Sequence, residues 1–168
     1  MTTNEKYVTM INNNLNELRK TESFSDIAVH WYERGDEAAW VYINGAADKY
    51  NTITTNLFFN QFSDERFVLQ ERQCYLEDPN GKLFATGTAW AGTEDEFVGY
   101  GRPHWIAVLP EYQGKGYGTI LISVLCKRLV SLGYERAYLT TSTLRPKAIK
   151  LYEKFGFEIV SIKDPTEN

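Results

Sequence analysis

The spacing of apolar positions along the chain predicts a domain in which strands and helices alternate. Over residues 116–132, apolar side chains recur as they do on one face of a helix. Short β-branched and aromatic runs bounded by turn residues predict strands. The predicted helices cover residues 36–47, 56–62, 116–132 and 146–155, and the predicted strands cover residues 27–33, 67–77, 82–90, 104–109, 136–141 and 157–162. This order indicates an α/β or α+β domain built on one mixed sheet.

The first 25 residues follow a different pattern from the rest. Thr2 and Glu5 have the spacing of a capping box, and apolar residues recur at helical intervals at Val8, Ile11 and Leu15. We therefore predict an amphipathic N-terminal helix that docks on another surface, with a mobile arm as the alternative. In the predicted domain organisation, residues 1–25 form this extension and residues 26–168 form a single domain.

Size, composition and charge narrow the function classes. A chain of 168 residues with 43% hydrophobic residues is long enough to bury a core without disulfides or metal. The formal net charge of −4 lacks the basic excess typical of nucleic-acid binding, so we expect no nucleic-acid partner. No apolar run approaches the ~18 residues of a membrane span, and the polar start has no signal-peptide core, so we expect no membrane partner and a cytoplasmic location. Two Cys and two His lack zinc-ligand spacing, which predicts free thiols and no metal site.

The segment from Val108 to Gly118 is the most informative part of the sequence. A predicted strand ends there, a glycine-rich turn follows, and a long helix begins at once. Glycines let the backbone approach a ligand closely, and the N–H groups of a helix N-terminus attract anions. The turn has neither the G-K-[ST] ending of a Walker loop nor the G-x-G-x-x-G spacing of a dinucleotide fingerprint. It predicts a phosphate site of another kind, with a plain strand-to-helix turn as the alternative.

Two ordered motifs resemble those of a known family. The pattern Gln113-x-x-Gly116-x-Gly118, preceded by Val108-x-Pro110, resembles the acetyl-coenzyme A loop of the GNAT superfamily of N-acetyltransferases. Residues 148–157 are similar to the later A-I-x-L-Y-x-x-x-G-F helix of that superfamily and follow the loop at the expected separation. The resemblance covers residues 82–162 well, residues 26–81 only by the order of elements, and residues 1–25 not at all.

The resemblance implies a splayed mixed sheet flanked by helices, with acetyl-coenzyme A bound where the strands ending near Val108 and Thr141 part. A backbone N–H at Val108 or Leu109 would face the thioester oxygen, where negative charge develops during acyl transfer. The backbone of the turn and of the helix start would bind the pyrophosphate, at residues Gln113, Gly114, Lys115, Gly116, Tyr117, Gly118 and Thr119.

Two side chains are candidates for proton transfer. Tyr152 matches the family's tyrosine that protonates the departing thiolate, although its spacing also fits an ordinary core position. Strand alternation places His104 on one face with Ile106 and Val108, and its position resembles that of a proton-relaying histidine in arylalkylamine N-acetyltransferases. The alternatives to a His104 base are a core histidine, or a carboxylate of Glu111 or of residues 94–96 that acts through water.

The sequence departs from the family pattern in two places. Arg145 and Pro146 stand where many members carry an asparagine, which puts the usual amide contact to the coenzyme in doubt. The final strand of many members is also missing, because Pro165 and a polar tail follow the last predicted strand. An open sheet edge needs a cover. The two candidates are the predicted N-terminal helix and the same edge of a second protomer in a homodimer.

These features together predict an acetyl-coenzyme A dependent N-acetyltransferase. We expect transfer to a primary amine of a small molecule, by direct attack in a ternary complex. Cys74 and Cys126 have no neighbouring histidine in the sequence, so a covalent enzyme intermediate lacks a nucleophile. The alternatives are a protein or peptide N-acetyltransferase and a noncatalytic acyl-coenzyme A binding module.

Overall fold

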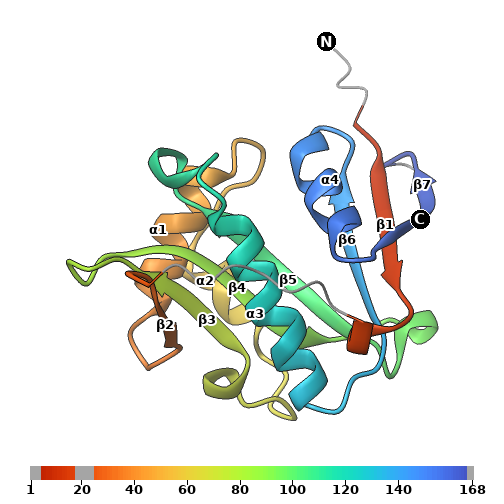
Figure 1. Cartoon of the computed structure of the whole chain (residues 1–168), viewed down its shortest axis with the longest axis horizontal. Coiled ribbons are helices and arrows are strands. Elements are labelled where there is room, and N and C mark those ends of the chain that lie inside the picture. Colours follow the sequence, from red (N-terminus) through yellow and green to blue (C-terminus); the bar gives the residue numbers. More distant parts are fainter. Residues whose placement is uncertain (1–4, 18–24, 166–168) are drawn as a thin grey trace.

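One seven-stranded mixed sheet organises the chain, and helices pack on both of its faces (Figure 1). The computed structural model describes residues 5–17 and 25–165. The strands are β1 (Tyr7–Asn12), β2 (Ala28–Trp31), β3 (Gln73–Glu77), β4 (Leu83–Ala91), β5 (Gly101–Val108), β6 (Ala137–Ser142) and β7 (Glu158–Lys163). The helices are α1 (Glu37–Ala47), α2 (Thr55–Gln61), α3 (Tyr117–Ser131) and α4 (Pro146–Lys154). Within the described ranges, no helix has the length and apolar character to cross a membrane.

Helix α3 shows how local sequence sets an element. Leu121, Leu125 and Leu129 are four residues apart and fully buried, and they pack α3 across β4 and β5. The helix ends at Ser131, and Gly133 adopts a φ of 90°, as expected for a left-handed helix stop. Helices α1 and α2 lie on the opposite face of the sheet (Figure 1).

The predicted N-terminal helix is wrong. Among the described residues of that segment, the chain forms strand β1 and then a short 3-10 turn at Leu15–Glu17. Val8, Met10 and Asn12 are buried on one face, and the residues between them are more exposed, so burial follows a period of two. The apolar residues of this segment fit both the helical period and the period of two of a strand, and its asparagines are weak helix formers. Strand partners on both sides therefore decide its conformation.

β1 lies inside the sheet rather than covering an edge. The strand order is β2-β3-β4-β5-β6-β1-β7. β1 pairs antiparallel with β6, where Tyr7 is opposite Ser142, and with β7, where Tyr7 is opposite Lys163. β1 is thus an inner strand of the sheet, and no strand follows β7 among the described residues. The predicted helix therefore does not cover the edge of the sheet. On this side of the sheet β7 is the outermost strand. The homodimer stays a prediction.

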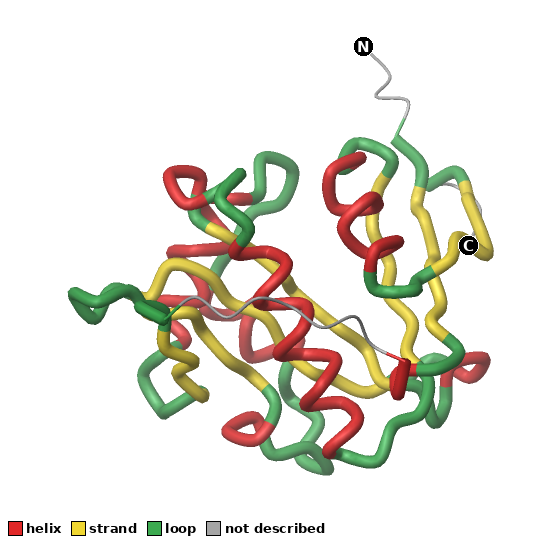
Figure 2. The backbone as a smooth tube through the Cα atoms, viewed as in Figure 1, coloured by secondary structure: helices red, strands yellow, loops and turns green. Residues whose placement is uncertain are grey.

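The parallel neighbours β5 and β6 separate along most of their length. They are in register only at Gly101 and Ala137, where the Gly101 N–H donates to the Arg136 carbonyl at 2.8 Å. Beyond this point the strands diverge (Figure 2). Backbone groups that face the gap have no sheet partner there, so a ligand can pair with them. The splayed mixed sheet predicted from the sequence is confirmed.

The other predicted elements agree with the structure except at one strand. The stretch 67–77 was predicted to be extended throughout, but Leu69–Glu71 forms a 3-10 turn and β3 begins only at Gln73. The turn places the Arg72 side chain to donate to the Ala89 carbonyl at 3.1 Å. A shortened β3 leaves the hairpin with β4 intact.

Candidate functional site

The glycine-rich turn between β5 and α3 has the backbone shape of an anion site. Gly114 and Gly116 have φ values of 77° and 90°, which residues with a side chain rarely adopt. Residues 113–116 are exposed, and α3 begins directly after them at Tyr117, so the positive end of the helix dipole adjoins the turn. The exposed Lys115 adds a positive charge. These residues fit the pyrophosphate of a coenzyme.

Two residues of the predicted coenzyme set serve other contacts. A Cβ atom at Gly118 would meet Leu151 Cδ2 at 3.1 Å, so this glycine allows α3 to pack against α4. The Thr119 N–H donates to the Gly116 carbonyl at 3.1 Å. We expected both residues to face the pyrophosphate, and the structure gives each of them a neighbour within the protein.

The two backbone amides proposed for the thioester differ in direction. The Leu109 N–H donates to the Phe84 carbonyl at 2.9 Å, so it is used within the sheet. Backbone groups alternate in direction along a strand, so those of Val108 point the other way, toward the gap beside β6. There the Val108 carbonyl accepts a hydrogen bond from Gln113 Nε2 at 2.9 Å. Val108 therefore remains the candidate donor, and Leu109 does not.

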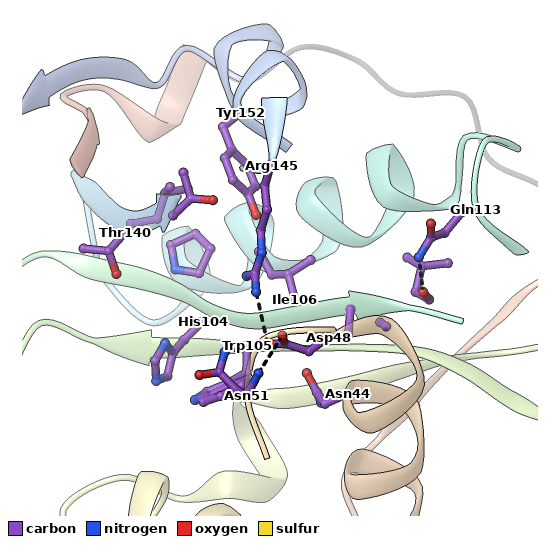
Figure 3. Close-up of a pocket in the computed structure, with 16 residues that line it drawn as sticks. Asn44, Asp48, Asn51, His104, Trp105, Ile106, Gln113, Thr140, Arg145 and Tyr152 are labelled. Atoms are coloured by element: carbon purple, nitrogen blue, oxygen red, sulfur yellow. Dashed lines mark hydrogen bonds and ion pairs between the residues drawn. The ribbon is translucent and has the colours of Figure 1, made fainter. Parts of the chain in front are cut away.

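A cavity of about 320 Å³ opens where β5 and β6 part (Figure 3). Residues of both strands line it, together with the end of α1, Arg145 just before α4, and Tyr152 within α4. Four predicted site residues line this cavity, namely His104, Val108, Gln113 and Tyr152. The turn residues 114–119 lie outside the lining, at the start of α3. The structure thus joins the predicted proton-transfer residues in one cavity and places the predicted phosphate turn beside it.

Tyr152 meets the physical requirements of a proton donor. Its ring points from α4 toward the cavity (Figure 3). The side chain is buried, and burial raises the pKa of Tyr152 to about 12, although the positive charge of Arg145 opposes the shift. The phenol therefore keeps its proton at neutral pH.

His104 lies on a different face of β5 from the predicted one. In the ladder with β4, Thr88 is opposite His104 and Thr86 is opposite Ala107. Residues paired across an antiparallel ladder share a face, so His104 lies with Ala107 and not with Val108. The cause is a bulge at Trp105, whose φ is 50°. The expectation that His104, Ile106 and Val108 share one face is wrong.

The surroundings of His104 favour a neutral imidazole. Nε2 lies 3.1 Å from Gln61 Oε1, and Trp105 Nε1 donates to the same oxygen at 2.9 Å. Because an amide oxygen only accepts, we assign the ring proton to Nε2 and the lone pair to Nδ1. Burial lowers the pKa of His104 well below its usual value, and the charge of Arg102 lowers it further.

Sequence analysis missed an acidic residue in the cavity wall. Asp48 follows the last residue of α1, and Arg145 Nη2 donates to its Oδ2 at 3.0 Å across the gap between the two halves of the sheet (Figure 3). Burial alone would raise the pKa of Asp48, but hydrogen bonds from Asn51 and Tyr50 and the charge of Arg145 hold it below its usual value. A carboxylate at a helix C-terminus opposes the helix dipole, and this mismatch was the available signal.

The part of the chain that forms the turn and the cavity matches a known protein family. A sequence profile described as "Acetyltransferase (GNAT) family" matches residues 42–157, which include the turn, the cavity and the α4 motif. The chain belongs to the GNAT acetyltransferase family. The resemblance drawn from the two sequence motifs is therefore confirmed.

Two curated relatives of this GNAT chain carry N-acetyltransferase or acetyltransferase names. Mycothiol acetyltransferase of Streptomyces griseus is 27% identical over 134 residues, which are 78% of this chain and 43% of the relative. S-(2-succino)cysteine N-acetyltransferase of Bacillus subtilis is 31% identical over 93 residues, which are 53% of this chain and 56% of the relative. The chain thus spans only about half the length of these relatives.

Solved structures show the same fold. A GCN5-related N-acetyltransferase from Sphaerobacter thermophilus has a TM-score of 0.77 at 17% identity, over 94% of this chain and 49% of that one. The ribosomal-protein-S18-alanine N-acetyltransferase from Escherichia coli has a TM-score of 0.65 at 25% identity, over 80% of this chain and 79% of that one.

Proposed function

We propose that this protein transfers an acetyl group from acetyl-coenzyme A to a primary amine of a small molecule. One observation carries the proposal: the cavity between β5 and β6 brings the backbone edge at Val108 together with Tyr152 and His104. A donor for a developing oxyanion, a proton donor and a proton acceptor are the groups that direct acyl transfer needs.

Each group has one task in the proposed reaction. The coenzyme supplies the acetyl group as a thioester, held by the turn at residues 113–116. The Val108 N–H donates to the carbonyl oxygen as negative charge builds there. The amine nitrogen bonds to the carbonyl carbon while the carbon–sulfur bond breaks. Tyr152 gives its phenolic proton to the sulfur, the amine gives up a proton, and Tyr152 regains a proton from water before the next turnover.

We assign removal of the amine proton to His104. Its Nδ1 carries the lone pair, and the lowered pKa keeps the imidazole neutral at the pH of the reaction. A lowered pKa makes the imidazole a weaker base than one whose pKa lies near the pH of the reaction, and the proton passes on from His104 to water. The carboxylate of Glu111 is a poorer candidate, because it lies outside the cavity and pairs with Lys82 at 3.1 Å.

The transfer we propose is direct, without an acetylated enzyme. Cys74 and Cys126 are buried, and burial raises the pKa of each thiol to about 12. A thiolate is the nucleophilic form of cysteine, so neither side chain is suited to carry the acetyl group. Trapping of an acetyl-cysteine would contradict this assignment.

The preference for a small acceptor rests on the cavity and on the relatives. A volume of about 320 Å³ suits a small ligand, and the Arg145–Asp48 ion pair crosses the gap beside it. The names of both curated relatives refer to small molecules. The second candidate is acetylation of a protein, which is favoured by the fold shared with the ribosomal-protein-S18-alanine N-acetyltransferase.

A thiol-release experiment tests the proposal. The chain is mixed with acetyl-coenzyme A and a panel of small primary amines and peptides, and the free thiol and the acetylated product are measured. We expect turnover with members of the small-amine set. Turnover with peptides alone would favour the protein acetyltransferase, and coenzyme binding with no turnover on any acceptor would favour a binding module.

A further inference from the structure

Two side chains in the cavity wall carry a full charge, and they come from opposite sides of the gap. Asp48 ends α1 and Arg145 precedes α4, and Arg145 Nη2 lies 3.0 Å from Asp48 Oδ2. The other lining residues are apolar or uncharged, because His104 is neutral there. The cavity therefore presents one positive and one negative group side by side, near Tyr152 and His104 (Figure 3).

The two members of this pair are held very differently. Asp48 is fixed: Oδ1 accepts from the Tyr50 and Asn51 N–H groups at 2.8 and 3.1 Å, and Oδ2 accepts from Asn51 Nδ2 at 2.8 Å. Its side chain is only 9% exposed. The side chain of Arg145 is 42% exposed, and among the described residues its one hydrogen bond runs from Nη2 to Asp48. A guanidinium has five N–H donors, so Arg145 has donors to spare.

We propose that the acceptor is an amine that also carries a carboxylate, as an amino acid does, and that Arg145 binds the carboxylate. This inference rests on the proposed function and adds the substrate class. Asp48 holds Arg145 in place through Nη2 and attracts the ammonium of the incoming acceptor. The remaining N–H groups of Arg145 form the planar fork that matches a carboxylate.

Charge complementarity selects this class over other amines. A cationic amine without a carboxylate would be attracted to Asp48 but would also be repelled by the like charge of Arg145. A zwitterion matches both charges of the cavity at once. Arg145 also stands where many family members carry an asparagine, so a charged side chain replaces a neutral one at this position.

The test compares each common amino acid with its carboxamide as acceptor, in the full chain and in Arg145→Gln. The carboxamide keeps the amine and the side chain but removes the negative charge. Arg145→Gln keeps an N–H donor for Asp48 but removes the charged fork. Arg66→Gln is the matched control, because Arg66 pairs with Asp64 at 2.6 Å outside the cavity. For each protein, kcat/KM for the amino acid is divided by kcat/KM for its carboxamide. Comparing this ratio between the wild type and the variant cancels the different intrinsic reactivity of acid and amide.

We expect Arg145→Gln to lower kcat/KM about tenfold or more for the amino acid and less than about threefold for its carboxamide. Arg145→Lys should restore part of the loss, and Arg66→Gln should change neither. Equal losses for acid and amide would overturn the proposal. So would a rise in KM for acetyl-coenzyme A alone, which would make Arg145 a coenzyme residue.

A binding measurement separates this inference from the proposed function. If no acceptor turns over, amino acids and carboxamides are titrated into the chain by calorimetry. Binding of an amino acid that is lost in Arg145→Gln, without binding of its amide, would support the carboxylate site although transfer fails. Binding of neither would overturn it. Thermal unfolding of each variant shows whether a loss of binding or activity comes from misfolding. If Arg145→Gln does not fold, the same comparison is made with Arg145→Lys.

Discussion

The two halves of the sheet are built in different ways. Strands β2 to β5 are neighbours in the same order as in the sequence, each antiparallel to the next. In the other half, β1 comes from the start of the described chain and lies between β6 and β7 from its end. The first half therefore pairs strands that follow one another along the chain, whereas the second joins residues more than a hundred positions apart, such as Tyr7 and Ser142.

The functional site lies where these two halves meet and takes residues from each. His104 and Asp48 belong to the half whose strands pair in chain order, and Tyr152 and Arg145 belong to the half that the chain ends hold together. The halves share a sheet register only at Gly101 and Ala137. A change that loosens the second half should therefore disturb the site even when it lies far from the cavity.

Deletion of residues 1–12, with an initiating Met retained, is expected to have the largest effect. It removes both ladders of β1 and the fully buried Val8 and Met10. Truncating one such buried Met costs about 2–5 kcal/mol, and a whole domain has only about 5–15 kcal/mol of stability. We expect loss of cooperative thermal unfolding, measured by circular dichroism. Deletion of residues 1–4 is the control, and an unchanged Tm after the longer deletion would contradict the role of β1.

This contrast also explains how much the sequence could predict. The turn at Gly114 and Gly116, helix α3 and the α4 motif were recognised because their signals lie within one stretch of chain. β1 was misassigned because Val8, Ile11 and Leu15 fit a helical period, and its partners β6 and β7 lie at the other end of the sequence.

The site followed the same rule. The motif residues Tyr152 and Gln113 line the cavity, whereas Gly118 and Thr119 contact neighbours within the protein. The pairing of Asp48 with Arg145 spans 97 positions, and no local signal announces it. The bulge at Trp105 is set by pairing with β4, so simple alternation gave His104 the wrong face.

Tyr152→Phe tests the half held by the chain ends without disturbing its packing. The substitution keeps the ring and removes the hydroxyl. We expect the rate of acetyl transfer to fall about 10²–10⁴-fold, the usual contribution of a proton donor. Thermal unfolding should change little, because the buried ring remains. Unchanged turnover with an acceptor for which chemistry is rate-limiting would make Tyr152 a core residue only.

Gly116→Val tests the turn at the boundary between the halves, with Gly133→Val as a matched control. Both glycines have a φ of 90°, and they lie at opposite ends of α3. A valine at either position costs about 1–2 kcal/mol of backbone strain, so both variants should lose stability. We expect only Gly116→Val to weaken acetyl-coenzyme A binding, by about tenfold or more, since its Cβ meets the phosphates. Equal coenzyme affinity in the two variants would remove the turn from the binding site.

A smaller effect on stability is expected from His104, which lies in the half whose strands pair in chain order. Its folded pKa lies below the unfolded value, so the unfolded chain binds more protons as the pH falls below about 6.5. The stability that the neutral His104 contributes is therefore fully present above that pH. It is lost as the pH falls toward the folded pKa, by at most about 1.4 kcal/mol per pH unit. We expect the wild type to lose more stability than His104→Gln between pH 7 and pH 5, measured by urea unfolding. Parallel curves for the two proteins would show that His104 titrates as in water.

The smallest effect is expected from moving β1 to the other end of the chain. The start of β1 adjoins the end of β7: Tyr7 is opposite Lys163, and Lys6 Nζ lies 3.5 Å from Asp164 Oδ1. An Asn-Gly turn between Asp164 and Lys6 would therefore close a hairpin. A permuted chain would run from Ser25 to Asp164 and through this turn into residues 6–17.

This permuted chain keeps every described strand in its place in the sheet, replaces the connection from β1 to β2 by the new turn, and omits residues 1–5 and 165–168. We expect a Tm within about 5 °C of the wild type, because closing a short loop changes the chain entropy little, and we expect the same acetyl-transfer activity. Deletion and permutation together separate two reasons why the second half could need β1, namely its position in the sequence and its place in the sheet. If the permuted chain unfolds as the deleted one does, the second half depends on where β1 stands in the sequence. If it folds, the place of β1 between β6 and β7 is what matters.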